Sequence, residues 1–308
     1  MLKAGDWVQV RSEPEILSTL DQEGKLEGMP FMPEMLQFCG RRVRVFKRAD
    51  KTCDTITTYQ SRRLMNTVHL DGLRCDGCSH GGCEAGCLLF WKEAWLRTVE
   101  EQATDGPVGV TRATLESRTS RPDPAAPGER LYVCQATELL AASTPLRFWD
   151  VRQYVRELRS RNVSFGTMAT SLVLSWYNVL RRKLGLKPHP VVAGKLTTTP
   201  RATLGLQPGE RVRVKSKDEI VATLNTDQRN RGLWFDVEMV PFCGREFTVL
   251  RRVQRIVNDR TGKMIDLPGD CIVLQDVVCG GCLSRNRLFC PRSIYPYWRE
   301  IWLERVAS

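Results

Sequence analysis

Cysteine residues gather in two short stretches of this chain, and their spacing is typical of metal ligands. Residues 75–87 read CDGCSHGGCEAGC and also contain one of the three histidines of the chain. Residues 279–290 read CGGCLSRNRLFC, a sparser version of the same pattern. A C-x-x-C turn supplies two thiolates from one bend of the backbone, and zinc favours four such ligands in a tetrahedron. Both stretches are therefore predicted to hold metal ions.

The two cysteine stretches belong to a longer internal repeat. Cys39 in FCGRR and Cys75 have counterparts 204 positions later, at Cys243 in FCGRE and at Cys279. After the cysteine stretches the offset becomes 207, as in the EAWL and EIWL segments near the ends of the two copies. The match indicates a tandem duplication with an unrelated middle.

The repeat selects one ligand set for each copy. The FCG cysteine and the C-x-x-C pair recur in both copies. Counting back eight residues from the paired tryptophans Trp91 and Trp298 matches Cys83 with Cys290. We therefore predict two Zn²⁺ ions per chain, each bound by four thiolates. The first set is Cys39, Cys75, Cys78 and Cys83, and the second set is Cys243, Cys279, Cys282 and Cys290.

The first copy also offers alternative ligands. His80 or Cys87 could replace Cys78 or Cys39 in the first set. An iron–sulfur cluster is the chief chemical rival to zinc, because four cysteines lie close together in this copy. The second copy has no counterpart of Cys87 yet keeps the FCG motif, which favours zinc. The cluster ligands would be Cys75, Cys78, Cys83 and Cys87.

Other residues of these stretches have simpler interpretations. Cys87 with His80 could act as a nucleophile and its base, but the sequence identifies no Asp or Asn partner for them. Cys53 and Cys134 are interpreted as buried thiols in strands. The chain contains no phosphate-binding glycine loop, no H-E-x-x-H and no G-x-S-x-G.

Composition describes an ordinary globular chain. Of the 308 residues, 42% are apolar and 26% are charged, and no window approaches the run of about twenty apolar residues that spans a bilayer. The polar start MLKAGDWVQV does not read as a signal peptide, so a cytoplasmic location and no membrane partner are expected. In that reducing compartment cysteines serve as metal ligands or free thiols more often than as disulfides.

The pattern within each copy predicts short strands. The copies open with GDWVQV and GERVRV, a glycine followed by alternating apolar residues, and later contain RVRVF and EFTVL. About five short strands in each copy of about a hundred residues, with G-x-x-V-x-V openings, resemble a small SH3-like β-barrel. That resemblance implies an α+β fold of two such barrels but no particular activity, because these barrels serve many functions.

The middle of the chain differs in kind. Residues 101–128 are polar and rich in proline and glycine, which predicts a flexible linker. Thr144-Pro145 is expected to start a helix whose apolar stripe includes Val151 and Val155. A second helix is expected over 164–184. The predicted domains are a first metal-binding barrel at 1–100, the linker at 101–128, a helical hairpin and connector at 129–208, and a second metal-binding barrel at 209–308.

Two classes of function remain open. The favoured hypothesis is a non-enzymatic, zinc-stabilised scaffold or adaptor that binds a protein partner. The alternative is a metal-dependent enzyme or enzyme subunit, with zinc or an iron–sulfur cluster reacting in the first copy. The net charge of +11 allows weak nucleic-acid binding as a second alternative, but acidic residues are interleaved with the basic ones.

Overall fold

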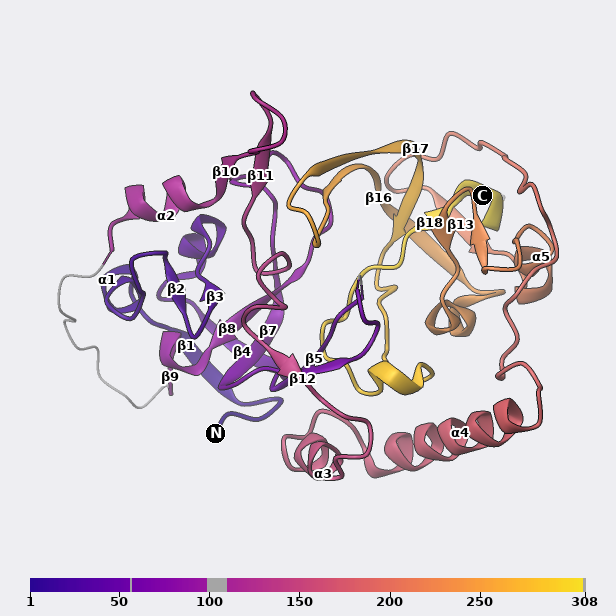
Figure 1. The fold of residues 1–308 in the computed structure, drawn as a ribbon, viewed down its shortest axis with the longest axis horizontal. Helices are drawn as coiled ribbons and strands as arrows, with labels where there is room; N and C mark the ends of the chain where they lie inside the picture. The colour runs from indigo at the N-terminus through magenta and orange to yellow at the C-terminus, as the bar shows by residue number, and fades with distance from the viewer. Residues whose placement is uncertain (56, 99–109, 307–308) are drawn as a thin grey trace. The chain divides into compact units, whose positions relative to one another are not determined.

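The computed structural model describes residues 1–55, 57–98 and 110–306, and its fold is a mixed α+β fold dominated by sheets (Figure 1). The fold class expected from the sequence is therefore confirmed at this level. The chain divides into two compact units. The first unit comprises Met1–Met168, Arg255–Ile265 and Asn286–Arg292. The second comprises Ala169–Gln254, Asp266–Arg285 and Ser293–Ser308, so two segments of the second copy belong to the first unit.

An open, curled, antiparallel sheet forms the centre of the first unit (Figure 1). Its strand order is β8-β7-β4-β1-β9. Val8 and Val10 are fully buried, as the alternation in GDWVQV predicts. The strands are β1 (Trp7–Val10), β4 (Arg42–Arg48), β7 (Thr67–Arg74), β8 (Leu88–Lys92) and β9 (Leu96–Thr98). Short elements beside the sheet are α1 (Glu13–Leu17), β2 (Lys25–Leu26), β3 (Met29–Pro30), η1 (Pro33–Phe38), β5 (Lys51–Cys53), β6 (Ser61–Arg63) and η2 (Glu93–Trp95).

The second unit contains a sheet with the corresponding strand order, β18-β17-β16-β13-β19. Its register also corresponds: Val8 pairs with Val43 in the first sheet, and Val212 pairs with Phe247 in the second. The strands are β13 (Arg211–Val214), β16 (Glu246–Val257), β17 (Met264–Leu274), β18 (Trp298–Arg299) and β19 (Leu303–Arg305). The short elements are α5 (Lys217–Val221), β14 (Arg229–Asn230), β15 (Leu233–Trp234), η3 (Val237–Phe242) and η5 (Glu300–Trp302). Residues 255–257 of β16, residues 264–265 of β17 and most of the turn η4 (Arg285–Arg287) belong to the first unit.

Each core is built around a tryptophan that ends a 3-10 turn, η2 in the first unit and η5 in the second. Trp95 is fully buried, its ring lies 5.1 Å from that of Phe31 in an edge-to-face contact, and its Nε1 donates to Thr19 Oγ1 at 3.1 Å. Trp302 is also fully buried and donates to Thr223 Oγ1 at 2.9 Å. An edge-to-face pair adds roughly 1 kcal/mol beyond the apolar area that it buries.

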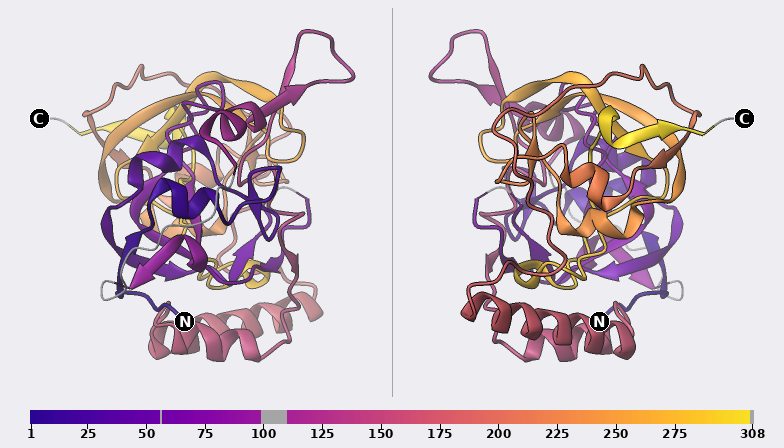
Figure 2. Two further views of the ribbon diagram at one scale, coloured as in Figure 1. Left: turned by 90° about the vertical axis from the view of Figure 1, so that its left-hand side faces the viewer. Right: turned by 90° about the vertical axis from the view of Figure 1, so that its right-hand side faces the viewer.

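The middle of the chain contains more regular structure than the sequence predicts. Residues 101–109 of the expected linker lie outside the described residues. The rest of it forms α2 (Arg112–Arg118), in which Leu115 is buried, and β10 (Ser120–Pro122). β10 pairs with β11 (Arg130–Tyr132) in a hairpin that projects from the first unit (Figure 2).

The first predicted helix starts later than expected. Thr144–Pro145 is not a helix start but the short strand β12, which pairs with β6. The Arg62 side chain fixes this arrangement by donating to the carbonyl oxygens of Leu140 and Ser143 at 2.9 and 2.6 Å. The helix α3 spans Arg152–Arg159, and the second predicted helix is α4, Phe165–Lys183. None of the described helices is both long enough and apolar enough to cross a membrane.

The predicted apolar stripe of α3 does not face the core. Val151 and Val155 are exposed, and Gln153 and Glu157 are buried instead. The polar face can be buried because its groups find partners: Gln153 Nε2 donates to the Arg147 carbonyl oxygen at 2.8 Å, and Glu157 accepts from Asn162 at 2.8 Å. Hydrogen bonding, which the hydrophobic pattern does not record, decides the orientation of this helix. The predicted apolar side of α4 is likewise largely exposed, at Phe165, Trp176 and Leu180.

A buried ion pair recurs at corresponding positions of the two units. Arg48 Nη1 donates to Glu93 at 2.6 Å, and Arg252 Nη1 donates to Glu300 at 2.5 Å. Glu300 also accepts the amides of residues 204–206 at 2.5–3.1 Å. Burial alone would raise the pKa of Glu300, but these amides and the guanidinium hold the pKa below its ordinary value of 4.5.

We expect Glu300→Gln to lower the free energy of unfolding by about 1–3 kcal/mol, because the arginine and the amides lose a charged acceptor. Since the pKa of Glu300 is lowered in the folded protein, its stabilisation is present above about pH 4.5 and fades as the pH falls through the folded value. Denaturant unfolding at pH 7 and pH 3 checks both points. Glu304→Gln is the control, with an expected change of about 0.5 kcal/mol or less, because its ion pair with Arg213 is exposed.

Candidate metal centre

A buried carboxylate holds the C-x-x-C loop of the first unit in place. Glu34 extends from η1, a turn that starts with Pro33 at its first position. Its Oε1 accepts the amide of Ser79 at 3.0 Å and lies 2.5 Å from His80 Nδ1. The loop is so tight that a Cβ at Gly77, where φ is +74°, would lie 2.0 Å from the backbone oxygen of Cys83.

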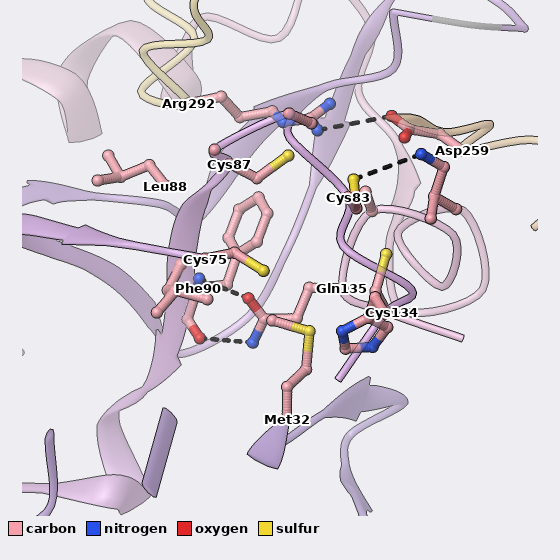
Figure 3. A pocket seen from close by; sticks show the side chains of 16 residues that line it. Met32, Cys75, Cys83, Cys87, Leu88, Phe90, Cys134, Gln135, Asp259 and Arg292 are labelled. Carbon is pink, nitrogen blue, oxygen red and sulfur yellow. Dashed lines mark hydrogen bonds and ion pairs between the residues drawn. The ribbon is translucent and has the colours of Figure 1, made fainter. Parts of the chain in front are cut away.

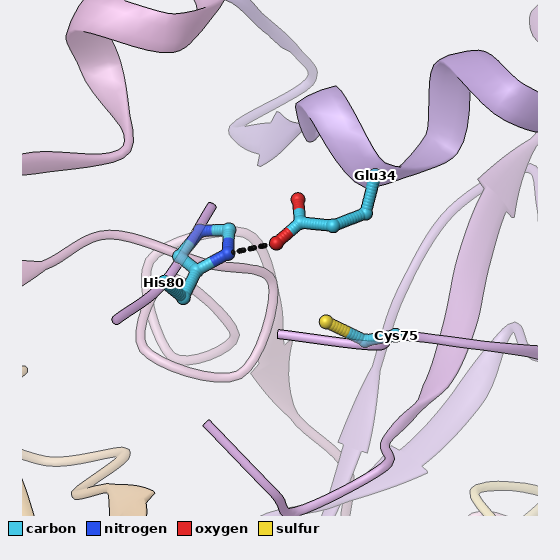
Figure 4. A group of neighbouring side chains, drawn as sticks. All are labelled: Glu34, Cys75 and His80. Atoms are coloured by element: carbon cyan, nitrogen blue, oxygen red, sulfur yellow. Dashed lines mark hydrogen bonds and ion pairs between the residues drawn. The ribbon is translucent and has the colours of Figure 1, made fainter. Parts of the chain in front are cut away.

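Glu34, Cys75 and His80 form a group with the dimensions of a metal site (Figure 4). One ligand atom from each residue lies within 4.8 Å of the others, and no other set of three or more His, Cys, Asp and Glu residues in the described chain is so close. The side chains of Glu34 and His80 are almost fully buried. The second carboxylate oxygen of Glu34, Oε2, has no hydrogen-bond partner among the described residues. An unpartnered buried oxygen is costly unless a cation or donor joins it.

The tautomer of His80 suits metal binding. Its Nε2 lies 2.9 Å from the carbonyl oxygen of Val133, which can only accept a hydrogen bond, so Nε2 carries a proton. This leaves Nδ1 as the nitrogen that faces Glu34. A ligating histidine commonly donates its other N–H to a backbone carbonyl in this way, which fixes the ring orientation. In the metal-free protein a proton occupies the short contact between Nδ1 and Glu34.

Sulfur atoms surround a small cavity beside this group (Figure 3). The side chains of Cys75, Cys83, Cys87 and Cys134 line it, together with Met32. The cavity measures about 30 Å³, room for one or two water molecules or a single ion. The amide of residue 257 donates to Cys83 Sγ at 3.3 Å, a contact typical of thiolate ligands.

Burial keeps Cys75, Cys87 and Cys134 of the cavity neutral. It raises the pKa of Cys87 and of Cys134 to about 12, with the Asp259 carboxylate adding to the effect. Burial, and then the charge of Glu34, raises the pKa of Cys75 still further. A buried thiolate without a nearby cation is unfavourable. At neutral pH these thiols therefore ionise only if a metal ion replaces their protons.

The structure gathers part of the first predicted ligand set. Cys75 and Cys83 line the cavity, and the two predicted alternates, His80 and Cys87, line it as well. Cys78 is exposed, and its amide donates to Asp76 at 3.0 Å. The remaining member, Cys39, packs at the edge of the apolar core, where burial raises its pKa to about 11. The four thiolates Cys39, Cys75, Cys78 and Cys83 are thus not brought together.

The second predicted set is divided between the two units. Cys243, Cys279 and Cys282 belong to the second unit and do not form a ligand group as close as that of Glu34. Cys290 belongs to a segment of the first unit, where its thiol is hydrogen-bonded to Cys53. The assignment of Cys290 from the tryptophan offset missed this, because spacing along the chain does not record which strand a loop returns to.

Glu238 is the counterpart of Glu34 in the second unit. Its Oε1 accepts the amides of Leu283 and Ser284 at 2.7 Å each, and its Oε2 accepts the amide of Cys282 at 3.0 Å. Both glutamates lie in largely apolar stretches, FMPEMLQFCG and FDVEMVPFCG, at the same repeat offset. That recurrence was the signal in the sequence for these two residues. Cys134 of the cavity lies in the middle segment and carries no such signal.

We expect Glu238→Ala to lower the free energy of unfolding by about 3 kcal/mol, because three buried amides lose their acceptor. Glu238→Gln keeps one acceptor oxygen and should have a smaller effect. Denaturant unfolding measures the change, and hydrogen exchange at residues 282–284 should accelerate in step. In the control Glu246→Ala, a partly exposed carboxylate is lost, and a change as large as that of Glu238→Ala would show that amide capture is not the cause.

Comparison with protein-family models, with curated proteins and with solved structures finds no match to this chain. The candidate centre therefore rests on its own residues: the distances among Glu34, Cys75 and His80, their burial, and the thiols beside them.

Proposed function

We propose that this chain is a non-enzymatic, zinc-stabilised scaffold whose first unit is held together by a buried metal ion. The observation that carries the proposal is the close group of Glu34, Cys75 and His80, with one carboxylate oxygen left unpartnered. The ligands are Cys75 Sγ, His80 Nδ1 and a Glu34 oxygen, and a thiolate of the cavity takes the fourth position. Sulfur, imidazole and carboxylate are all ordinary zinc ligands.

Burial favours a structural ion over a catalytic one. His80 is 1% exposed and Glu34 is 5% exposed, so the group offers no broad access to a substrate. Catalytic zinc keeps one position open for water or substrate, whereas structural zinc is closed by four protein ligands. The ion would join η1 to the C-x-x-C loop and, through the Val133 carbonyl, to the middle segment. A protein partner remains the proposed binding target of such a scaffold.

The recurrence of strand order, register and buried ion pairs supports the inferred tandem duplication of an SH3-like unit. A second zinc ion is proposed from the sequence pattern alone, which gives it the ligands Cys243, Cys279, Cys282 and Cys290; the first three of these lie in the second unit. The number of zinc equivalents bound to the purified chain therefore distinguishes one occupied centre from two. One equivalent corresponds to the first centre, and two correspond to both.

An iron–sulfur cluster is the second candidate, and one observation favours it. Cys75, Cys83, Cys87 and Cys134 face one cavity, so Cys134 would take the place that the sequence gave to Cys78 (Figure 3). Four thiolates are the usual ligands of such clusters. A cavity of about 30 Å³ would have to widen to hold one, whereas a single ion fits as it is. Zinc in a colourless protein supports the first proposal, and iron with visible absorbance supports the cluster.

Cys75→Ser should release the ion of the first unit, and Cys78→Ser should not. The two positions lie in one C-x-x-C turn, but only Cys75 lines the cavity, since Cys78 is exposed. Mass spectrometry of bound metal in the full chain measures the difference, and denaturant unfolding measures its consequence. Because structural zinc contributes on the order of 10 kcal/mol to small domains, Cys75→Ser should also destabilise the first unit strongly. If Cys78→Ser loses the metal ion, the proposed ligands are wrong, and the four thiolates predicted from the sequence become the better assignment.

Zinc binding should release protons and strengthen as the pH rises. Cys75 is a neutral thiol because its pKa is raised, and a further proton lies between Glu34 and His80, so about two protons leave with these three ligands. A third proton leaves if a cavity cysteine is the fourth ligand. Titration of chelator-treated protein with zinc in dilute buffer, followed by a pH indicator, counts them. Release of no protons would contradict the proposed ligands.

A further inference from the structure

Cys53 and Cys290 form a hydrogen-bonded pair of thiols inside the first unit, and neither lines the cavity of the candidate metal centre, although Arg292 beside them does. Cys53 ends β5, and Cys290 lies in the segment Asn286–Arg292. The two sulfur atoms share a hydrogen bond, and the side chains are only 3% and 4% exposed. The segment is held to the β5–β6 hairpin by two further bonds: Arg292 Nη1 to the Cys53 carbonyl oxygen, and Ser61 Oγ to the Asn286 carbonyl oxygen, each at 3.0 Å.

Cations surround this pair. Arg287 and Arg292 are both buried and act on both sulfur atoms, and the backbone amide of Arg292 donates to Cys290. Lys51, two residues before Cys53, is 3% exposed. Its Nζ lies over the rings of Tyr154 and Phe289 at 5.5 and 5.6 Å and has no hydrogen-bond acceptor among the described residues. Buried positive charge of this kind stabilises a thiolate.

The surroundings of the pair shift the pKa values of the two cysteines in opposite directions. Burial by itself raises the pKa of Cys290, but the hydrogen bond from Cys53, the Arg292 amide and the two guanidinium groups lower it to about 7. The same hydrogen bond, together with burial, raises the pKa of Cys53. Cys290 is therefore the sulfur of the pair that ionises more readily, and Cys53 is the one that holds its proton. This differs from the cavity cysteines, of which Cys87 and Cys134 have pKa values near 12.

We propose that Cys53 and Cys290 are a redox-active dithiol that forms a disulfide, covalently joining Asn286–Arg292 to β5. A thiolate next to a thiol, within hydrogen-bonding distance, is the arrangement from which thiol–disulfide exchange proceeds. The observation that carries the proposal is independent of the proposed zinc centre. It also reassigns Cys290, which the sequence pattern placed in the second zinc set.

The reaction balances with a small disulfide as the oxidant. The Cys290 thiolate attacks one sulfur of the disulfide and expels the other as a thiolate, giving a mixed disulfide at Cys290. Cys53 then passes its proton to the expelled thiolate and attacks the Cys290 sulfur, expelling the second small thiolate, which takes up from the solvent the proton that Cys290 released on ionising. Two electrons pass from the dithiol to the small disulfide, which becomes two thiols. The protein loses two hydrogens and gains one S–S bond.

The test uses the full chain with oxidised glutathione as the probe, followed by alkylation of free thiols and peptide mapping by mass spectrometry. The expected product is a linked Cys53–Cys290 peptide pair, lighter by two hydrogens. Cys53→Ser should stop at a glutathione adduct on Cys290. Cys290→Ser should leave Cys53 reacting about tenfold more slowly, because Cys53 is not a thiolate at neutral pH. Cys271→Ser, which removes another buried cysteine that contacts an arginine, should leave the crosslink unchanged.

Two results would overturn the proposal. In the first, Cys53 and Cys290 of the folded wild-type chain both remain free thiols when oxidised glutathione is in large excess. In the second, Cys290→Ser loses a zinc equivalent that Cys53→Ser retains, which would make Cys290 the metal ligand of the sequence pattern. The first result comes from peptide mapping of the wild-type chain, so it does not depend on whether a variant folds. Metal analysis of the same samples distinguishes a failure of the dithiol proposal from a failure of the proposed zinc centre at Glu34.

Discussion

The arrangement of both cysteine loops depends on a buried carboxylate that accepts the amides of a tight turn. Glu34 and Glu238 extend from the 3-10 turns η1 and η3, each of which runs directly into an FCG motif. A glycine-rich loop leaves several amides without partners of its own, and a buried amide must find an acceptor. In the second unit three amides satisfy both oxygens of Glu238. The position of each loop is thereby set by one side chain.

The two glutamates differ in what remains unsatisfied, and that difference locates the candidate centre. Glu34 accepts a single loop amide, and His80 takes the place of the other donors. Among the described residues, one oxygen of Glu34 therefore stays without a partner, next to Cys75 and a cavity lined with thiols. Burial, with the Asp259 carboxylate, keeps the thiols of Cys87 and Cys134 protonated. A bound cation would interact favourably with both the carboxylate and the sulfur atoms. The carboxylate and the thiols cannot stabilise each other in this way.

Neighbouring charges shift the pKa values of buried cysteines in opposite directions at two places in the first unit. Cys75 and Cys134 of the cavity have the carboxylates of Glu34 and Asp259 respectively as neighbours, so burial and charge both raise the pKa of these two thiols. At the Cys53–Cys290 pair, the hydrogen bond from Cys53, the Arg292 amide and the two neighbouring arginines together outweigh burial and lower the pKa of Cys290. The same residue type thus serves two chemistries in one unit. The difference lies in the sign of the surrounding charge.

The sequence by itself determined the repeat offsets, the short strands that open each copy and the cysteine types from which a metal centre could be built. These depend on local patterns: alternation in GDWVQV, glycine at tight turns and the spacing of C-x-x-C. Only the tertiary structure decided which cysteines meet. Cys134 joins Cys75 at one cavity, and Cys290 joins Cys53, across sequence separations that spacing cannot bridge. The buried polar face of α3 depends on hydrogen bonds to residues just before and after the helix, which its hydrophobic pattern does not record.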